Sequence, residues 1–113
     1  MEQEPHEFIT PEIERRQHRR IRLVAQVKCE GLSREDILVT RDVSAGGMFI
    51  VANKPLPMGS EVALSFRLGA PDPLVSCRGK VVYSATGLGM GIEFIDLNEE
   101  TRRALQKFVD EAN

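Results

Sequence analysis

The sequence predicts an all-β fold, a six-stranded antiparallel (Greek-key-like) barrel, followed by a C-terminal α-helix and preceded by a flexible N-terminal arm. Six short runs alternate apolar with polar residues, glycine and proline separate the runs, and the apolar spacing becomes helical only after Asn98. The 113 residues are 42% hydrophobic, which suffices for one modest core but not for two. We therefore expect a single domain.

The first 14 residues are expected to form the flexible arm. They contain five Glu, no Lys or Arg, and few apolar residues beyond Phe8 and Ile13, so they cannot bury enough apolar surface to fold alone. Thr10-Pro11-Glu12 fits the start of a short helix, with threonine as N-cap. This divides the chain into an acidic arm (1–14) and a barrel domain (15–113), which includes an arginine-rich segment and the helix.

The first strand is predicted from Leu23 onward and shows a clear period of two. One face of this strand is apolar and consists of Leu23, Ala25, Val27 and Cys29. Residues 31–36 (GLSRED) are expected to turn the chain into the second strand. There Ile37, Val39 and Val43 are predicted to face inward. Arg41 is the discordant member of that face, and we expect it at an end of the barrel.

Four further strands follow the pair Gly46-Gly47. They are predicted over 48–51, 62–68, 74–84 and 88–94, separated by the turn sequences NKPLPMG and GAPDP. In the run 74–84 one face is predicted to be inward and consists of Val75, Cys77, Gly79, Val81 and Tyr83. A helix should begin after Asn98 as N-cap, and its apolar stripe is formed by Leu105, Phe108, Val109 and Ala112. This stripe is expected to pack on the barrel.

The composition favours a cytoplasmic protein that is not exported. Cys29 and Cys77 are too few for a disulfide framework and lie in alternating apolar runs, so we expect reduced, buried thiols. The N-terminus is acidic and lacks an apolar signal region, and no run reaches the ~18 apolar residues that a membrane span needs. We expect neither membrane insertion nor a cofactor or a metal, and either a monomer or a weak dimer.

Two motifs carry the functional prediction, and the first is a cluster of arginines. The formal net charge is −2, yet residues 15–22 hold five of the eleven arginines, namely Arg15, Arg16, Arg19, Arg20 and Arg22. The planar guanidinium group binds phosphate or the O6/N7 edge of guanine through two hydrogen bonds and stacks on flat rings. The cluster predicts an anion site, although such a segment is often only a solvated face.

The second motif is Asp42-Val43-Ser44-Ala45-Gly46-Gly47. A period of two places Thr40, Asp42 and Ser44 opposite Val39 and Val43, so a carboxylate and a hydroxyl are predicted to project outside the core. A carboxylate can accept from the two donors on the Watson–Crick edge of guanine, and Gly47 would let backbone approach a ligand closely. Alone, the motif more often marks an ordinary polar turn.

Together the two motifs resemble those of the PilZ domain family, in which RxxxR is followed by [D/N]xSxxG. Here RRxxxR is Arg15, Arg16 and Arg20, and the second motif is Asp42, Ser44 and Gly47. The stretch 89–94 (GMGIEF) also looks like the family's late barrel strand, and the resemblance covers roughly residues 14–112. It implies a cytoplasmic bacterial receptor, or adaptor, for cyclic-di-GMP.

The resemblance also implies a set of ligand-binding roles. Arg16 and Arg20 would contact phosphates and guanine faces, and Asp42 and Ser44 would take the polar edge of guanine, with Gly46 and Gly47 in the adjoining turn. Arg15 precedes RxxxR, a feature that the family associates with an intercalated ligand dimer, so two nucleotides per chain are expected. Arg15 and Arg19 satisfy RxxxR as well, and both registers remain open. Ligand binding would close the arm and change contact with an unidentified downstream protein in motility, exopolysaccharide production or a related process.

Three alternatives remain. A nucleic-acid-binding barrel is disfavoured because the pI is near 5.7 and exposed aromatics for stacking are hard to find. An enzyme is disfavoured because the chain has only His6 and His18 and shows no nucleophile elbow, metal-ligand spacing or phosphate loop. The third is a PilZ-like protein-interaction module that does not bind nucleotide, which the retention of all motif positions argues against.

Overall fold

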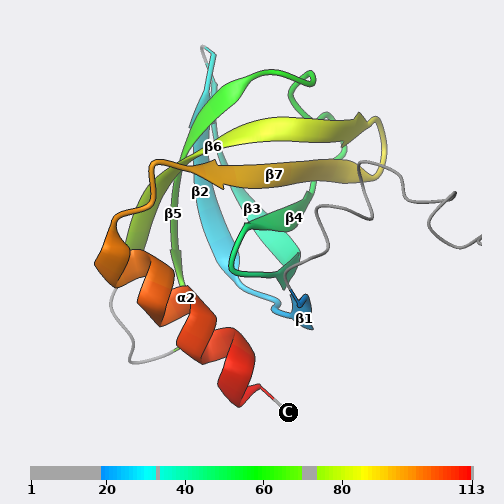
Figure 1. Ribbon diagram of the computed structural model, residues 1–113. Coiled ribbons are helices and arrows are strands. Elements are labelled where there is room, and N and C mark those ends of the chain that lie inside the picture. The colour runs from blue at the N-terminus through cyan, green and yellow to red at the C-terminus, as the bar shows by residue number, and fades with distance from the viewer. Residues whose placement is uncertain (1–18, 33, 70–73, 113) are drawn as a thin grey trace, which may run out of the picture.

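The computed structural model describes residues 19–32, 34–69 and 74–112 (Figure 1). This part of the chain contains seven strands and one helix: β1 (Ile21–Arg22), β2 (Gln26–Gly31), β3 (Arg34–Val43), β4 (Gly47–Val51), β5 (Glu61–Arg67), β6 (Leu74–Ala85), β7 (Gly89–Ile95) and α2 (Glu99–Glu111). The predicted arm and the short helix at Thr10 lie outside the described residues.

Six of the strands close into an antiparallel barrel. The order is β3-β2-β5-β6-β7-β4, and β4 pairs back onto β3, so the sheet has no open side in this ring. The two-residue β1 adds to the end of β3 through the pairs Ile21↔Val43 and Arg22↔Asp42. The predicted all-β barrel with a C-terminal helix is therefore confirmed.

The core fills the barrel with the inward residues of all six strands. The largest fully buried side chains include Phe66, Met48, Ile50 and Met90. Phe66 stacks on Phe94 with ring centroids 6.1 Å apart, which joins β5 to β7 across the interior. Burial of such side chains contributes roughly 1.5–3 kcal/mol each, so this core is the main source of stability.

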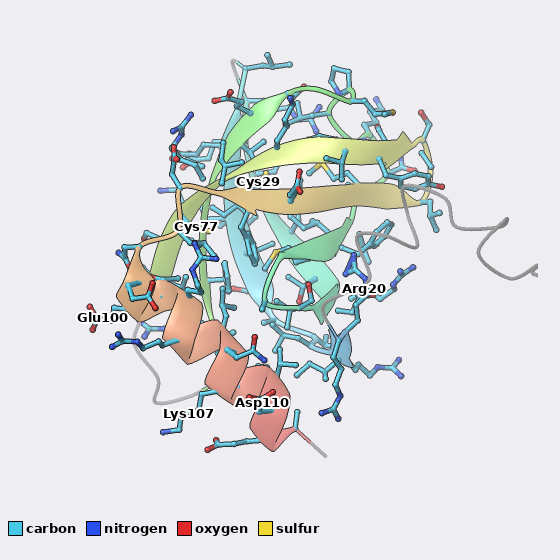
Figure 2. All side chains as sticks on the ribbon, in the orientation of Figure 1. Arg20, Cys29, Cys77, Glu100, Lys107 and Asp110 are labelled. Carbon is cyan, nitrogen blue, oxygen red and sulfur yellow. The ribbon has the colours of Figure 1, made fainter. Side chains whose placement is uncertain are left out.

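The helix α2 lies outside the barrel wall and contributes to the same core (Figure 1). Asn98 caps it as predicted, because its side-chain oxygen accepts from the N–H of Thr101 at 2.7 Å. Leu105 and Val109 are buried. Figure 2 shows Glu100, Lys107 and Asp110 on parts of the helix turned away from the barrel. The predicted amphipathic arrangement is confirmed.

The turn between β2 and β3 is shorter than the sequence predicted. Gly31 pairs directly with Arg34, so residues 34–36 belong to β3 rather than to a six-residue turn. Leu32 has a φ of 55°, a left-handed conformation that a tight turn requires. Residues near an exposed hairpin tip are polar whether they belong to a paired strand or to the turn. Their polarity therefore led the sequence analysis to predict too long a turn.

A bulge in β3 overturns the predicted inward face of that strand. Thr40 pairs with Ile50 and Asp42 with Phe49, so Arg41 is an extra residue relative to β4. The inward positions before the bulge are therefore even-numbered, and Val43 is inward only after it. Ile37 and Val39, predicted to be buried, are 70% and 43% exposed. Arg41 is not a discordant inward residue, since it points outward.

Thr40 is buried, contrary to the prediction that it projects outside the core. Its hydroxyl donates to the carbonyl of Leu23 and accepts from the N–H of Ala25 at 3.1 Å. The side chain thus takes the place of ladder hydrogen bonds where the chain bends between β1 and β2. The predicted run from Leu23 is therefore a strand only from Gln26 onward (β2), and β1 lies before the predicted start.

A second bulge, in β6, reverses the predicted position of Tyr83. Val81 pairs with Ile92 and Tyr83 with Gly91, which leaves Val82 as the extra residue. Val75 and Val81 are buried as predicted, but Tyr83 is 48% exposed. No helix within the described ranges is long and apolar enough to cross a membrane.

The two cysteines are expected to be unreactive in the folded protein. Burial raises the pKa of both Cys29 and Cys77 to about 11, and Asp36 adds to the effect at Cys29. Cys29 is buried and Cys77 is partly buried, and Figure 2 labels both on the barrel strands. At pH 8 only about one thiol in a thousand is then a thiolate, the reactive form. Alkylation by iodoacetamide should be slow in buffer and fast in denaturant, and fast labelling of the folded chain would contradict this expectation.

The raised cysteine pKa also predicts a loss of stability at alkaline pH. The neutral thiol is favoured in the fold, so its contribution is fully present below the unfolded-state pKa, about 8.5, and is lost as the pH rises through the folded-state value. Urea unfolding between pH 8 and 10.5 should therefore show a steeper decline for the wild-type chain than for a variant with both Cys29→Ala and Cys77→Ala. Parallel declines would show that other groups dominate.

Candidate functional site

The structure brings together two predicted site residues that lie 22 positions apart in the sequence. Arg20 Nη1 donates to Asp42 Oδ1 at 3.0 Å. β1 pairs Arg22 with Asp42, so Arg20, two residues earlier in the chain, lies diagonally across from Asp42 and reaches its carboxylate. Figure 2 shows Arg20 at the end of the barrel where β1 lies. The predicted residues Arg15 and Arg16 lie outside the described residues.

Of the three charged side chains in this contact, that of Asp42 is the least exposed to solvent. Its other oxygen, Oδ2, accepts from Nε of Arg41 at 3.0 Å, so a guanidinium lies on each side of the carboxylate. The side chain of Asp42 is 16% exposed, against 37% for Arg20 and 56% for Arg41. A carboxylate has about four lone-pair sites, so two remain for a ligand that donates hydrogen bonds.

Ser44 organises the turn that follows β3 rather than projecting into solvent as predicted. It is 4% exposed, and its hydroxyl oxygen accepts from the N–H groups of Gly46 and Gly47 at 3.1 and 3.2 Å. Ser44 lies in the turn beyond Val43, the last residue of β3, where strand alternation no longer sets the direction of its side chain. The predicted outward position of Ser44 is therefore wrong, and its observed contacts hold the β3–β4 turn next to Asp42.

Gly47 is required by strand packing. A Cβ at this position would lie 2.0 Å from the carbonyl oxygen of Ile92 in β7. The carbonyl of Gly46 accepts from the N–H of Phe94 at 2.8 Å, so the whole turn is fastened to β7. The glycine therefore allows the close approach of a neighbouring strand, whereas the sequence suggested close approach of a ligand.

Sequence reasoning missed three residues beside Asp42. The guanidinium of Arg41 lies over the ring of Phe49, 4.0 Å from its centroid, and Phe49 contacts Tyr83 with centroids 6.3 Å apart. Arg41 and Tyr83 point outward at the two bulges, and the ring of Phe49 between them is 7% exposed. The sequence contained one signal for these residues, the charged Arg41 at a position predicted to be inward. Such a residue indicates that the inward and outward positions of the strand have exchanged.

Arg19 points elsewhere than Arg20. Its Nη2 donates to the carbonyl oxygen of Ala112, the residue that caps the C-terminal end of α2, at 3.0 Å. A cation at this end of a helix offsets the partial negative charge of the last carbonyls. Neighbouring arginines of the segment thus contact the helix and the barrel, respectively.

The arrangement suits a ligand that carries both negative charge and hydrogen-bond donors. Arg20 and Arg41 supply guanidinium donors, and Asp42 between them supplies an acceptor with unused lone pairs. In the described part of the chain there is no group of three or more His, Cys, Asp or Glu side chains that could hold a metal ion.

Comparisons with known proteins agree with this fold. The family model described as "PilZ domain" matches residues 14–111. Three solved structures are similar: the Bacillus subtilis inhibitor of motility MotI/DgrA (21% identity, TM-score 0.70), the PilZ domain of YcgR from Escherichia coli with c-di-GMP (15%, 0.67), and the PilZ domain of CeSA from a cellulose-synthesizing bacterium (20%, 0.60).

The similarities to these structures extend over most of this chain. They cover 85%, 85% and 80% of it, respectively, and 49%, 89% and 94% of the other chains. The chain thus spans about half the length of MotI/DgrA. A search of curated protein sequences gives no significant match. At these identities the structural likeness concerns the fold.

Proposed function

Because this chain belongs to the PilZ domain family, we propose that it is a cytoplasmic receptor that binds cyclic-di-GMP where the arginine segment meets the end of β3. The observation that carries the proposal is the contact between Arg20 and Asp42, which joins the RxxxR segment to the DxSxxG segment at 3.0 Å. The similar YcgR domain was solved with c-di-GMP. The proposed activity is ligand binding rather than catalysis.

In the proposed complex the arginines bind the phosphates and the carboxylate binds guanine. Arg16 and Arg20 donate to phosphate oxygens and stack on guanine faces, while Asp42 accepts from the guanine N1–H and amino group. The register Arg16/Arg20 is supported by the position of Arg20 beside Asp42, since Arg19 donates to Ala112 instead. Arg15 would add a second cation and favour an intercalated ligand dimer.

The remaining motif residues act through the backbone. Ser44 fixes the turn through Gly46 and Gly47, and Gly47 lets that turn lie against β7. In the proposal this rigid turn keeps Asp42 in place, so that its carboxylate is oriented before the ligand arrives. Such preorganisation lowers the entropy cost of binding.

The expected affinity is micromolar or tighter. Charge-assisted hydrogen bonds contribute about 1.5–3 kcal/mol each and a cation–π stack about 0.5–2 kcal/mol. Three arginines can therefore exceed the roughly 4 kcal/mol or more that association costs. Binding would draw the arm over the ligand and change the surface that a downstream protein contacts. The likeness to a motility inhibitor makes motility the first pathway to test.

Calorimetry on the full chain tests the proposal. Cyclic-di-GMP is expected to bind at micromolar or lower Kd and at least tenfold more tightly than cyclic-di-AMP or GTP, with a stoichiometry near two if Arg15 acts as proposed. Binding of long single-stranded RNA or DNA with steep salt dependence, and none of cyclic-di-GMP, would favour the nucleic-acid-binding alternative. Binding of neither would favour a protein-interaction module.

A further inference from the structure

The outer face of β3 and β4 carries exposed apolar side chains that the proposed nucleotide site does not use. Ile37, Val39 and Val51 are 70%, 43% and 47% exposed, and we call these three residues the outer apolar face. Val39 and Val51 lie opposite each other in register, and Ile37 is two residues from Val39 on the same side of β3. Three branched apolar side chains thus project together from one part of the barrel wall.

This surface is large for a free barrel wall. The three side chains together leave on the order of a few hundred Å² of apolar area in water, a size that often marks an interaction site. A partner cannot dock here by adding a strand, because Val39 is already paired with Gln26 of β2 and Val51 of β4. The contact must be made by side chains.

Opposite charges flank the outer apolar face. At one end Lys28 lies 2.9 Å from Glu35 and 3.4 Å from Glu30, one cation against two anions. At the other end Asp42 lies between Arg20 and Arg41, one anion against two cations. The outward positions of β3 therefore read acid, apolar, apolar, base: Glu35, Ile37, Val39 and Arg41.

We propose that this face is the contact between two copies of this chain. When a second β3 strand runs in the opposite direction, the order acid–apolar–apolar–base places each acid opposite a base and each apolar residue opposite an apolar residue. A two-fold axis between Ile37 and Val39 would produce this antiparallel arrangement of the two β3 strands. Each Ile37 would then pack on the Val39 of the other copy, and each Glu35 would lie opposite an Arg41. This inference does not rest on nucleotide binding. The apolar area is below that of standard specific interfaces, so the dimer is weak and concentration-dependent.

Sedimentation velocity of the ligand-free full chain over a range of concentrations provides the first test. The wild-type chain is expected to shift reversibly from monomer toward dimer. Val39→Lys should weaken dimerisation at least tenfold. Met58→Lys, which also replaces an apolar side chain by lysine but at a 66% exposed site in the β4–β5 loop, should leave dimerisation unchanged. Circular dichroism checks that both variants fold. A wild-type chain that stays monomeric would overturn the proposal.

A charge exchange tests the antiparallel register. Glu35→Arg and Arg41→Glu should each weaken self-association at least tenfold, because each creates two like-charged contacts across the axis. An equimolar mixture of the two variants should associate again, since every contact between unlike chains is then attractive. A mixture no more associated than either variant alone would overturn the proposed arrangement, whatever the outcome of nucleotide titrations.

Discussion

Replacing Arg20 with alanine is expected to weaken cyclic-di-GMP binding by about 2–5 kcal/mol, a loss of roughly 30-fold to several thousand-fold in affinity. Arg20 of the RxxxR segment contacts Asp42 at 3.0 Å. Its loss would remove a proposed phosphate donor and the guanidinium on one oxygen of this partly enclosed carboxylate, while Arg41 keeps its contact with the other oxygen. Calorimetry with the ligand measures the effect directly.

The matched control is Arg103→Ala, which removes the same charge from a 78% exposed position on α2. It should change the affinity by less than about twofold, because charges separated by more than a Debye length, about 10 Å, are largely screened. Asp42→Asn, in turn, should reduce the preference for guanine over adenine dinucleotide as well as affinity. If Arg20→Ala binds like the wild type while remaining folded, the site assignment is wrong.

Replacing Gly47 with alanine is expected to destabilise the protein by about 3 kcal/mol or more. The new Cβ would lie 2.0 Å from the carbonyl oxygen of Ile92, and a backbone atom of a paired strand cannot rotate away as a side chain can. The two strands would have to separate where β4 closes the barrel against β7. Urea unfolding followed by circular dichroism measures the change.

Gly91→Ala is the control for that prediction. It lies in the neighbouring strand, and its Cβ would meet the Cβ of Tyr83 at 3.4 Å, an ordinary contact. It should cost less than about 1 kcal/mol. Equal destabilisation by both substitutions would show that the flexibility of glycine matters here, rather than the approach of β7 to Gly47.

Fold class and element order could be predicted from local pattern alone. Alternation in β2 and in the first part of β6 is regular, so the inward residues Val27, Cys29, Val75 and Val81 were placed correctly. The helix α2 was predicted with its N-cap because Asn98 and the spacing of Leu105 and Val109 are local signals. Each of these features depends on residues within a few positions of one another.

The site could be predicted only in part. Arg20 and Asp42 were chosen as residue types that bind nucleotides, and the structure places them in contact. Arg41 and Phe49 were missed because the bulge in β3 brings Arg41 to the outer surface, and Ser44 was assigned to the wrong face because it lies in the turn beyond the end of β3. The bulge depends on how β3 pairs with β4 in the closed barrel. The sequence pattern of β3 alone does not reveal this pairing.

The sequence by itself determined the barrel, its C-terminal helix and the two chemical motifs, since hydrophobic period and turn residues act locally. Only the tertiary structure decided which side chains share a surface. Closure of the barrel imposed bulges at Arg41 and Val82, which turned Val39 and Tyr83 outward, while the turn after β3 buried Ser44. The physical reason is that strands in a closed ring must match their neighbours on both sides, and a one-residue shift exchanges the inner and outer faces.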